Sequence, residues 1–411
     1  MAITTSQAGE AGQMRTPRAL LLTLYQSALQ AVEGRRCVAN ALRQGEPAFD
    51  HKDLALVAVG KAALSMAEGA VEVLGERIQA GLVITKAGYG PARIAHAEHI
   101  EIIEGAHPVP DARSLAAGRR LVDFLKALPA DVPLLFLTSG GTSSLVEVLP
   151  ETMNLTDLQQ LNDSLLASGL AIAEMNRRRK QASLIKGGRL AGYLNERPVL
   201  NLLLSDVPDN ALNVIGSGLL VPDERDEFFI DPACLESIQY KIIADNQQAC
   251  LAAKAAAEAR GLPVRYYDTP LQGEVTQVAH DIMARLTKAK PGIHIWGGEP
   301  TVVLPEQPGR GGRNQQLALL LAVAIQQRPE LHILVAATDG SDGPTEEAGA
   351  LVDSETVRRG EQEGMSAQAS LQRADAGRFL EASGDLISTG PTGTNVMDIV
   401  IAHKMAYSDQ V

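Results

Sequence analysis

The sequence predicts an α/β protein of two domains, with mostly parallel sheets covered by helices on both faces. Short apolar runs alternate with amphipathic helical segments along most of the chain, which is the pattern of repeated strand-helix units. The runs are apolar throughout, as expected of strands that are buried on both faces. The 411 residues exceed one ordinary hydrophobic core, which favours two domains.

The first domain is predicted over residues 1–235. Apolar residues at helical spacing indicate a first helix over 17–33, which ends at Gly34. The alternation follows, with strands predicted over 54–59, 81–85, 100–104, 134–138 and 199–204. Further helices are predicted over 62–74, 111–128, 155–167 and 170–179. The stretch 221–232 is rich in Asp, Glu and Pro and is the predicted linker.

The second domain is predicted over residues 236–411. Its strands are expected over 241–244, 264–267, 293–296, 333–337 and 396–402. Its longer helices are expected over 245–260, 274–288 and 315–326, the last of them rich in leucine. Neither domain contains a repeat of fixed period or a low-complexity segment.

Charge and composition exclude several classes of protein. The net charge of −12 argues against a surface that follows nucleic-acid phosphates or anionic membranes. The three cysteines are far apart and form no CxxC pair, so neither a disulfide framework nor a zinc site is indicated. The longest apolar run, 317–325, is shorter than the roughly 20 residues that span a bilayer. We therefore expect a cytoplasmic protein that acts on a small molecule, and a homodimer is compatible with the sequence.

Polar loops follow most of the predicted strands. Ligands of open parallel sheets bind beyond the carboxyl ends of the strands, so these loops are the candidate site. The most informative loop follows the strand 134–138 and combines two glycines with four hydroxyls, a composition suited to an anion at a helix N-terminus. The candidate residues are Lys61, Lys86, Ser139, Gly140, Gly141, Thr142, Ser143, Ser144, Asp206, Glu299, Asp339, Asp342, Thr392 and Asn395.

The residue types in these loops indicate phosphoryl transfer. Glycines, hydroxyls and lysines suit phosphate, while Asp206, Asp339 and Asp342 are the hard oxygen ligands that Mg²⁺ takes. A lysine that opens a helix, as Lys61 does, opposes the helix dipole by roughly 0.3–1 kcal/mol, so its placement suggests an anion nearby. Arg313, followed by Asn314, could clamp a phosphate or carboxylate with its guanidinium fork.

Each of these residues also has a purely structural interpretation. The glycine-rich loop could be a tight strand-to-helix turn, and Lys61 a surface lysine. Asp206 could cap a helix, and Asp339 and Asp342 could shape Asp-Gly turns. Arg313 could simply begin its helix. The residues alone leave these alternatives open.

Familiar nucleotide and hydrolase motifs are absent from the sequence. Gly60 and Lys61 lack the upstream glycine of a Walker A loop, and no GxGxxG occurs, although a nicotinamide-dependent dehydrogenase normally has one. HExxH and GxSxG are also missing. His96 and His99 are expected to be surface residues, and His107 is expected to be structural.

Nine segments of the chain, taken in order, carry a resemblance to a known family. They are LVAVGKAALSMAEG, GLVITKAGYG, EGAHPVPDARS, LTSGGTSSLVEVLPE, LIKGGRLAGYL, LLLSDVPDN, WGGEPTVVLP with GRGGRNQQLAL, AATDGSDGPTEEAGALVD and STGPTGTNVMDIVIA. Together they resemble the glycerate 2-kinase family, which has often carried the label hydroxypyruvate reductase, from about residue 18 to 404. The motifs are individually weak, but nine in the same order are specific.

The resemblance implies two α/β domains with an active-site cleft between them. It also implies phosphorylation of the 2-hydroxyl of D-glycerate to 2-phosphoglycerate, with ATP and a divalent metal. Lys61 and Asp206 stand where the family has its catalytic Lys and Asp, and Arg313, Asp339 and Asn395 fall in its C-terminal motifs. We therefore expect Lys61 and Asp206 to be catalytic, and Asp206 and Asp339 to bind Mg²⁺.

Three substitutions in family motifs put the substrate, more than the fold, in question. The family usually reads SGGGSALL where this chain has Ser139 to Leu145, and a histidine is missing from the run 177–183. The third departure follows Asp206. Lys86, Arg179 and Arg189 are candidates to bind the carboxylate of the substrate, with Lys180 as a further choice. Alternatives to a glycerate kinase are a kinase for another short hydroxy acid, an NAD(P)H-dependent hydroxypyruvate reductase and a non-catalytic sugar-acid or nucleotide binding protein.

Overall fold

The computed structural model describes residues 16–45, 49, 52–89, 93–167, 172–223 and 230–406. These residues form two compact units. The parallel-sheet unit comprises the described parts of 33–245 together with 393–395, and the mixed-sheet unit comprises those of 1–32, 246–392 and 396–411. The predicted domain boundary at 235 stays a prediction. The predicted linker lies partly outside the described residues, as does the start of the predicted helix over 170–179.

The parallel-sheet unit has six strands in the order β3-β2-β1-β4-β5-β6, and all of them run parallel. The strands are β1 (Leu54–Val59), β2 (Ile78–Lys86), β3 (Ile100–Gly105), β4 (Leu134–Thr138), β5 (Val199–Leu204) and β6 (Ile238–Ala244). The strand order reverses between β1 and β4. The loops after these two strands therefore begin at the switch point of the sheet, where doubly wound proteins bind ligands.

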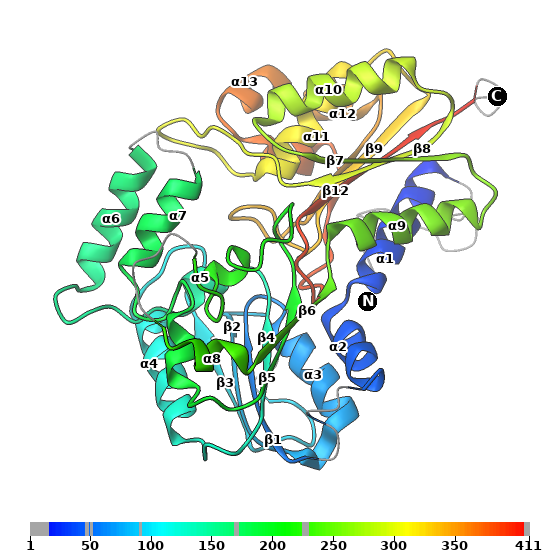
Figure 1. Ribbon diagram of the computed structural model, residues 1–411. Coiled ribbons are helices and arrows are strands. Elements are labelled where there is room, and N and C mark those ends of the chain that lie inside the picture. Colours follow the sequence, from blue (N-terminus) through cyan, green and yellow to red (C-terminus); the bar gives the residue numbers. More distant parts are fainter. Residues whose placement is uncertain are drawn as a thin grey trace. The chain divides into compact units, whose positions relative to one another are not determined.

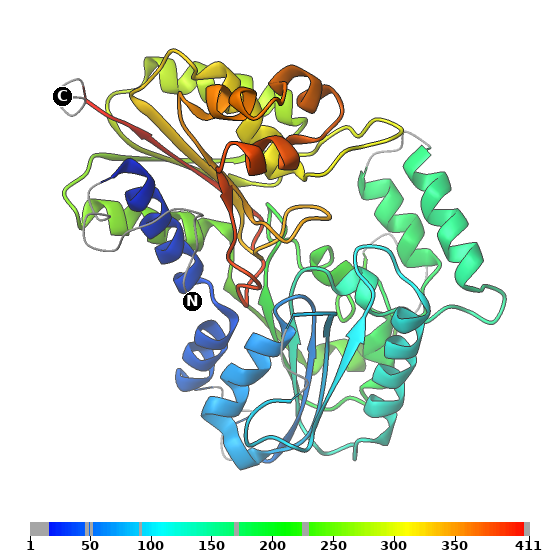
Figure 2. The ribbon, with the colours of Figure 1, turned by 180° about the vertical axis from the view of Figure 1, so that it is seen from behind.

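Helices cover both faces of this sheet because the central strands are apolar on both sides. One face packs under α4 through side chains such as Val57, Leu121 and Phe136, and the other carries α3, beside which α2 lies (Figures 1 and 2). The helices are α2 (Gly34–Arg43), α3 (Ala63–Leu74), α4 (Ala112–Ala127), α5 (Thr142–Leu145), α6 (Leu155–Ala167), α7 (Ile172–Gln181) and α8 (Pro232–Glu236). Short 3₁₀ turns are η2 (Gly75–Arg77), η3 (Arg189–Tyr193) and η4 (Ile215–Ser217).

The mixed-sheet unit also has six strands, in the order β11-β10-β9-β12-β8-β7. They are β7 (Val264–Leu271), β8 (Gly292–Gly298), β9 (Leu331–Ala337), β10 (Gly349–Val352), β11 (Leu386–Ile387) and β12 (Asp398–Lys404). The α/β class is confirmed. In this sheet, however, only β7 and β8 pair in parallel. The strand β12 lies between β8 and β9 and runs antiparallel to both, and the pairs β9–β10 and β10–β11 are also antiparallel.

Helices again lie on both faces of the mixed sheet. The helices α10 and α11 cover one face and α1 and α9 the other (Figure 1). Tyr25 of α1 is fully buried, and its hydroxyl donates a hydrogen bond to the carbonyl of Ala337 at 2.5 Å. The helices are α1 (Pro17–Ala31), α9 (Asn246–Glu258), α10 (Val275–Lys288), α11 (Arg313–Ala324), α12 (Thr356–Gln362), α13 (Ala367–Gln372) and α14 (Ala376–Ala382).

Among the residues that the structure describes, no helix has both the length and the apolar character needed to cross a bilayer.

Candidate functional site

The loops after β1 and β4 are joined by hydrogen bonds at the switch point of the parallel sheet. The amide of Lys61 donates to the carbonyl of Gly140 at 2.9 Å. The hydroxyl of Ser139 accepts from the amide of Ala62 at 3.1 Å, and the amide of Ser139 donates to the carbonyl of Val59 at 3.0 Å. The lysine loop and the glycine-rich loop therefore hold each other in one conformation.

Gly140 lies where no side chain would fit. A Cβ at this position would overlap the carboxylate of Asp206, which follows β5, and the side-chain amide of Asn395. Gly140 is not among the glycines with positive φ, so lack of space, and not backbone strain, requires glycine here. The structure thus brings Asp206 and Asn395 against the glycine-rich loop.

Gly141 lies next to two further polar side chains. Its φ is +85°, which favours glycine, and a Cβ would lie 3.0 Å from Cγ of Lys61 and 3.2 Å from Cδ2 of His107. Lys61, Asp206, His107 and Asn395 therefore all approach the two adjacent glycines. His107 was expected to be structural, although its position directly beyond β3 is the same signal that identified the other loops.

The hydroxyls of the glycine-rich loop have different surroundings. The buried hydroxyl of Thr142 donates to the carbonyls of Val59 and Ser139, at 2.9 and 2.7 Å, which fixes the start of α5. The hydroxyl of Ser143 accepts from Ser217 at 2.8 Å and lines a cavity. Ser139 and Thr142 hold the loop together, whereas Ser143 is placed to meet a ligand.

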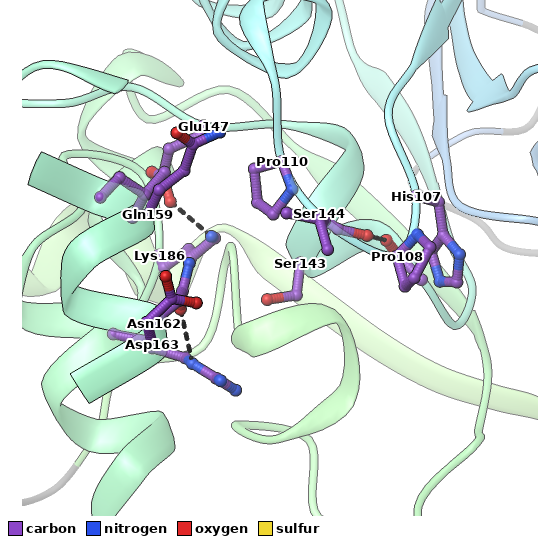
Figure 3. Close-up of a pocket in the computed structure, with 14 residues that line it drawn as sticks. His107, Pro108, Pro110, Ser143, Ser144, Glu147, Gln159, Asn162, Asp163 and Lys186 are labelled. Atoms are coloured by element: carbon purple, nitrogen blue, oxygen red, sulfur yellow. Dashed lines mark hydrogen bonds and ion pairs between the residues drawn. The ribbon is translucent and has the colours of Figure 1, made fainter. Parts of the chain in front are cut away.

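A cavity of about 520 Å³ opens beside this loop, entirely within the parallel-sheet unit. Figure 3 shows His107 and the two serines Ser143 and Ser144 on one side, and Glu147 and Lys186 on the other. Polar side chains of α6, together with Arg179 of α7, complete the wall. The cavity is therefore bounded by the candidate phosphate loop at one side and by a wall with both acidic and basic side chains at the other.

The side of this cavity opposite the glycine-rich loop contains a buried ion pair that the sequence did not reveal. The ammonium of Lys186 lies 2.5 Å from Oε2 of Glu147, and Oε1 of the same carboxylate accepts from Ser183 at 2.5 Å. Both charged side chains are at most 5% exposed. Because Lys186 and Glu147 are 39 residues apart in the sequence, no local sequence pattern identifies the pair. The only signal is the glycine-rich turn that follows Lys186.

The three predicted carboxylate-binding residues occupy different environments. Arg179 lines the cavity, where its Nε donates to the amide oxygen of Asn162 at 2.9 Å, and burial lowers the pKa of its guanidinium. Arg189 is buried, and its Nη1 donates to the carbonyls of Lys180 and Lys186 at 3.0 and 2.8 Å. Lys86 ends β2, with its ammonium 4.7 Å from the centre of the Tyr89 ring. Of the three, Arg179 is the one that lines the cavity.

In the mixed-sheet unit, the predicted cofactor residues gather at the N-terminus of α11. Arg313 contacts Asp398 through Nε and Nη2, at 2.6 and 3.1 Å, and Glu299 through Nη1 at 2.8 Å. Burial opposes its charge, but the carboxylates of Asp398 and Glu299 raise the pKa of the guanidinium. Arg313 is therefore fixed by two acidic side chains and remains positively charged.

Asp342 caps the same helix. Its carboxylate accepts from the amide of Asn314 at 3.1 Å, from the side chain of Asn314 at 3.3 Å and from the amide of Gln315 at 2.8 Å. Burial raises the pKa of Asp342 to about 7, and the two backbone amides act against this shift. These contacts give Asp342 a structural role, although as a cap of α11 and not as the Asp-Gly turn considered from the sequence.

Asp339 and Thr392 both lie near the carboxyl end of β9. The Oδ1 of Asp339 accepts from the amide of Ser341 at 3.0 Å, as in an Asp-Gly turn. The hydroxyl of Thr392 donates to the carbonyl of Thr338 at 2.5 Å and is buried. Burial, with the charges of Asp339 and Asp398, raises the pKa of Tyr25 well above its usual value.

The two predicted metal ligands are found in different units, Asp206 in the parallel-sheet unit and Asp339 in the mixed-sheet unit. Within the described residues, no group of three or more His, Cys, Asp or Glu side chains could hold a metal ion. Mg²⁺ in phosphoryl-transfer sites needs only one or two carboxylates, because substrate phosphates and water fill the other positions. The carboxylate of Asp206 beside a glycine-rich loop fits this kind of site.

Two families of known proteins match the chain. Residues 20–244 match the family described as "Domain of unknown function (DUF4147)", and residues 292–398 match the MOFRL family. A protein named D-glycerate 2-kinase from Thermotoga maritima is 35% identical, over 93% of this chain and 97% of its own length. A protein named putative hydroxypyruvate reductase from Agrobacterium vitis is 34% identical, over 84% and 97%.

A solved structure is also similar. The crystal structure of glycerate kinase from Thermotoga maritima superposes with a TM-score of 0.79 and 34% sequence identity, and the match covers 94% of this chain and 99% of that one. The fold and the order of the motifs are therefore shared along nearly the whole sequence.

Proposed function

The chain belongs to the glycerate 2-kinase family, and from that premise we propose that it transfers the γ-phosphoryl group of ATP to the 2-hydroxyl of D-glycerate. One observation supports this proposal above the others. The carboxylate of Asp206 and the side chain of Lys61 both approach the Gly140-Gly141 loop at the switch point of the parallel sheet. A cation and a general base beside an anion-binding loop are groups that phosphoryl transfer uses.

In this proposal the glycine-rich loop and Lys61 bind the transferred phosphoryl group. Backbone amides near Gly140 and Gly141 and the hydroxyl of Ser143 donate hydrogen bonds to its oxygens. The ammonium of Lys61 neutralises the charge that develops as the bond to ADP breaks. Ser139 and Thr142 contribute by holding the loop, since their hydroxyls are engaged with the backbone.

Asp206 accepts the proton of the attacking hydroxyl. The oxygen at carbon 2 of glycerate forms a bond to the γ-phosphorus while the bond from that phosphorus to the bridging oxygen of ADP breaks. The hydroxyl proton passes to the carboxylate of Asp206, and ADP leaves with the bridging oxygen. A positioned base of this kind contributes about 10²- to 10⁴-fold in rate.

Arg179 is the residue we assign to the carboxylate of glycerate. It lines the cavity beside the glycine-rich loop, and its contact with Asn162 orients the guanidinium fork. Arg189 is less suited because its Nη1 already donates to two backbone carbonyls. Lys86 remains a second candidate for the substrate.

Cofactor binding completes the proposal. Mg²⁺, held by Asp206 and Asp339, would neutralise phosphate charge. The residues assigned to ATP are Ser139, Gly140, Gly141, Thr142, Ser143, Arg313, Asn314, Asp339, Asp342, Thr392 and Asn395. We further propose a cytoplasmic location, which fits the three free cysteines, and a homodimer, which light scattering would test.

The decisive experiment is phosphorus NMR of the product formed from ATP and D-glycerate. A 2-phosphoglycerate signal, absent without enzyme, is expected. Lys61→Ala should lose at least about 10²-fold of the rate, because a charge that stabilises the transition state is removed. Full turnover by Lys61→Ala would remove its assigned role, and no phosphorylated product from any short hydroxy acid would refute the kinase.

The reductase is the second candidate, because relatives carry that name. Loss of NAD(P)H absorbance with hydroxypyruvate, without phosphorylation of glycerate, would favour it. Tight binding of sugar acids in calorimetry with neither reaction would instead indicate a non-catalytic binding protein.

A further inference from the structure

A second cavity, of about 560 Å³, lies in the mixed-sheet unit between the edge strand β7, the end of α10 and the start of β8. The charged residues of its described lining are all basic: Arg265, Arg285, Lys288 and Lys290. No aspartate or glutamate belongs to that lining, although the whole chain carries a net charge of −12. None of the residues assigned to the kinase site takes part.

Tyr267, which lines this basic cavity, belongs to an aromatic stack whose other ring, Trp296, is buried. The rings of Tyr267 and Trp296 are parallel within 1°, with centres 4.5 Å apart, and the Tyr267 hydroxyl lies 3.2 Å from Nδ1 of His294. The guanidinium groups of Arg265 and Arg285 lie over the Tyr267 ring, 5.3 and 5.2 Å from its centre. Two arginines from different elements are thus held over one ring.

These cations have no acidic partner in the part of the chain that the structure describes. Neither Arg265 nor Arg285 forms an ion pair there, whereas other arginines of the same unit, such as Arg310 and Arg358, do. Two positive charges over one ring repel each other, and an anion would remove that repulsion.

The end of α10 does not account for the cluster. Basic residues often lie near the C-terminus of a helix, where they meet the last carbonyls. Here the ammonium of Lys404 already takes that place, since it donates to the carbonyls of Leu286 and Ala289 at 2.9 and 2.8 Å. Arg265, moreover, comes from β7 and not from the helix.

We propose that this basic cavity binds a small anion carrying two or more phosphate groups. Guanidinium forks suit phosphate oxygens, and four cations match a polyanion better than a single carboxylate. Free pyrophosphate and the phosphate chain of a nucleotide share this chemistry.

The test is calorimetry with inorganic pyrophosphate on the full-length chain carrying Lys61→Ala, which weakens phosphate binding at the proposed kinase loop. Adding Arg265→Gln and Arg285→Gln should weaken pyrophosphate binding at least about tenfold, because each arginine donates charged hydrogen bonds. The matched control is Arg113→Gln with Arg358→Gln, which removes the same charge from exposed, paired arginines and should leave affinity unchanged.

ATP should bind at the cavity and adenosine should not. The part of each affinity that Arg265→Gln with Arg285→Gln removes reports the cavity alone: a larger loss for ATP than for pyrophosphate would identify a nucleotide as the ligand, and equal losses would identify the phosphates alone.

A second measurement uses the chain without substitutions at the cavity, in case the double variant does not fold. Pyrophosphate should protect Arg265 and Arg285 from phenylglyoxal, as measured by mass spectrometry of peptides, while Arg358 stays reactive. Equal affinity in the double variant and its parent, equal loss in the matched control, or unprotected arginines would each overturn the proposal.

Discussion

Gly140→Ala should test whether the reaction rate depends on the position of the Asp206 carboxylate and not only on its presence. A methyl group at residue 140 would overlap the carboxylate of Asp206 and the amide of Asn395, so both must move. Displacing a catalytic group by about 1 Å costs on the order of 10²-fold in rate, equivalent to about 2.7 kcal/mol of activation free energy. We therefore expect kcat in a coupled ATP/glycerate assay to fall by about two orders of magnitude.

The control for this variant is Gly192→Ala. A Cβ at residue 192 meets nothing within 4 Å, and this glycine is not among those with positive φ, so kcat should be unchanged. In the double variant with Asp206→Asn, Gly140→Ala should cause a smaller further loss than in the parent, because the part of its effect that acts through the Asp206 carboxylate is already gone and only the displacement of Asn395 remains. The reasoning is refuted if folded Gly140→Ala keeps kcat within about twofold of the parent, or if the two losses multiply.

Three further predictions concern the cavity and α11. Arg179→Gln should raise KM for glycerate at least about tenfold with a smaller change in KM for ATP, because it removes a charged contact to the carboxylate alone; equal effects on both would contradict the assignment. Lys186→Met should lower the free energy of unfolding by about 3–5 kcal/mol in denaturant titration, since it leaves the charge of Glu147 buried, and adding Glu147→Gln should restore part of it; no loss would show that the pair is not buried in solution. Asp342 has a pKa raised by burial to about 7, so its protonated form is favoured on folding, and its contribution to stability is present below about pH 4 and lost as pH rises through 7. Relative to Asp342→Asn, the parent should lose on the order of 4 kcal/mol of unfolding free energy across that range, and a constant difference would show that the pKa is not raised.

Much of the fold follows from local patterns. The buried strands were predictable because runs such as 134–138 are apolar and end abruptly in polar residues, and the same ends mark the loops at the switch point. The proximity of Lys61 and Asp206 to one loop then follows from parallel strands, whose carboxyl ends meet at one edge. Their roles stay predictions.

The features that could not be predicted from the sequence depend on contacts between residues that are far apart in the chain. The pair Lys186 and Glu147 has no local signature, because either residue read alone resembles an exposed charge. The direction of β12 could not be predicted from the sequence either, since an apolar strand has the same residue pattern in a parallel or an antiparallel ladder. The capping role of Asp342 depends on a helix that begins earlier in the sequence, at Arg313.

The place of β12 has a consequence for biosynthesis. The strand between β8 and β9 is made after the other strands of its sheet, whereas α1, which covers one face of that sheet, is made before all of them. The mixed sheet cannot be completed until residues near 404 have emerged from the ribosome. Until then the side chains of Leu21, Leu24 and Tyr25, which are buried in the folded unit, cannot be fully buried. A truncated fragment that starts at 246 would expose the surface these side chains cover, so fragments for expression should retain or replace α1.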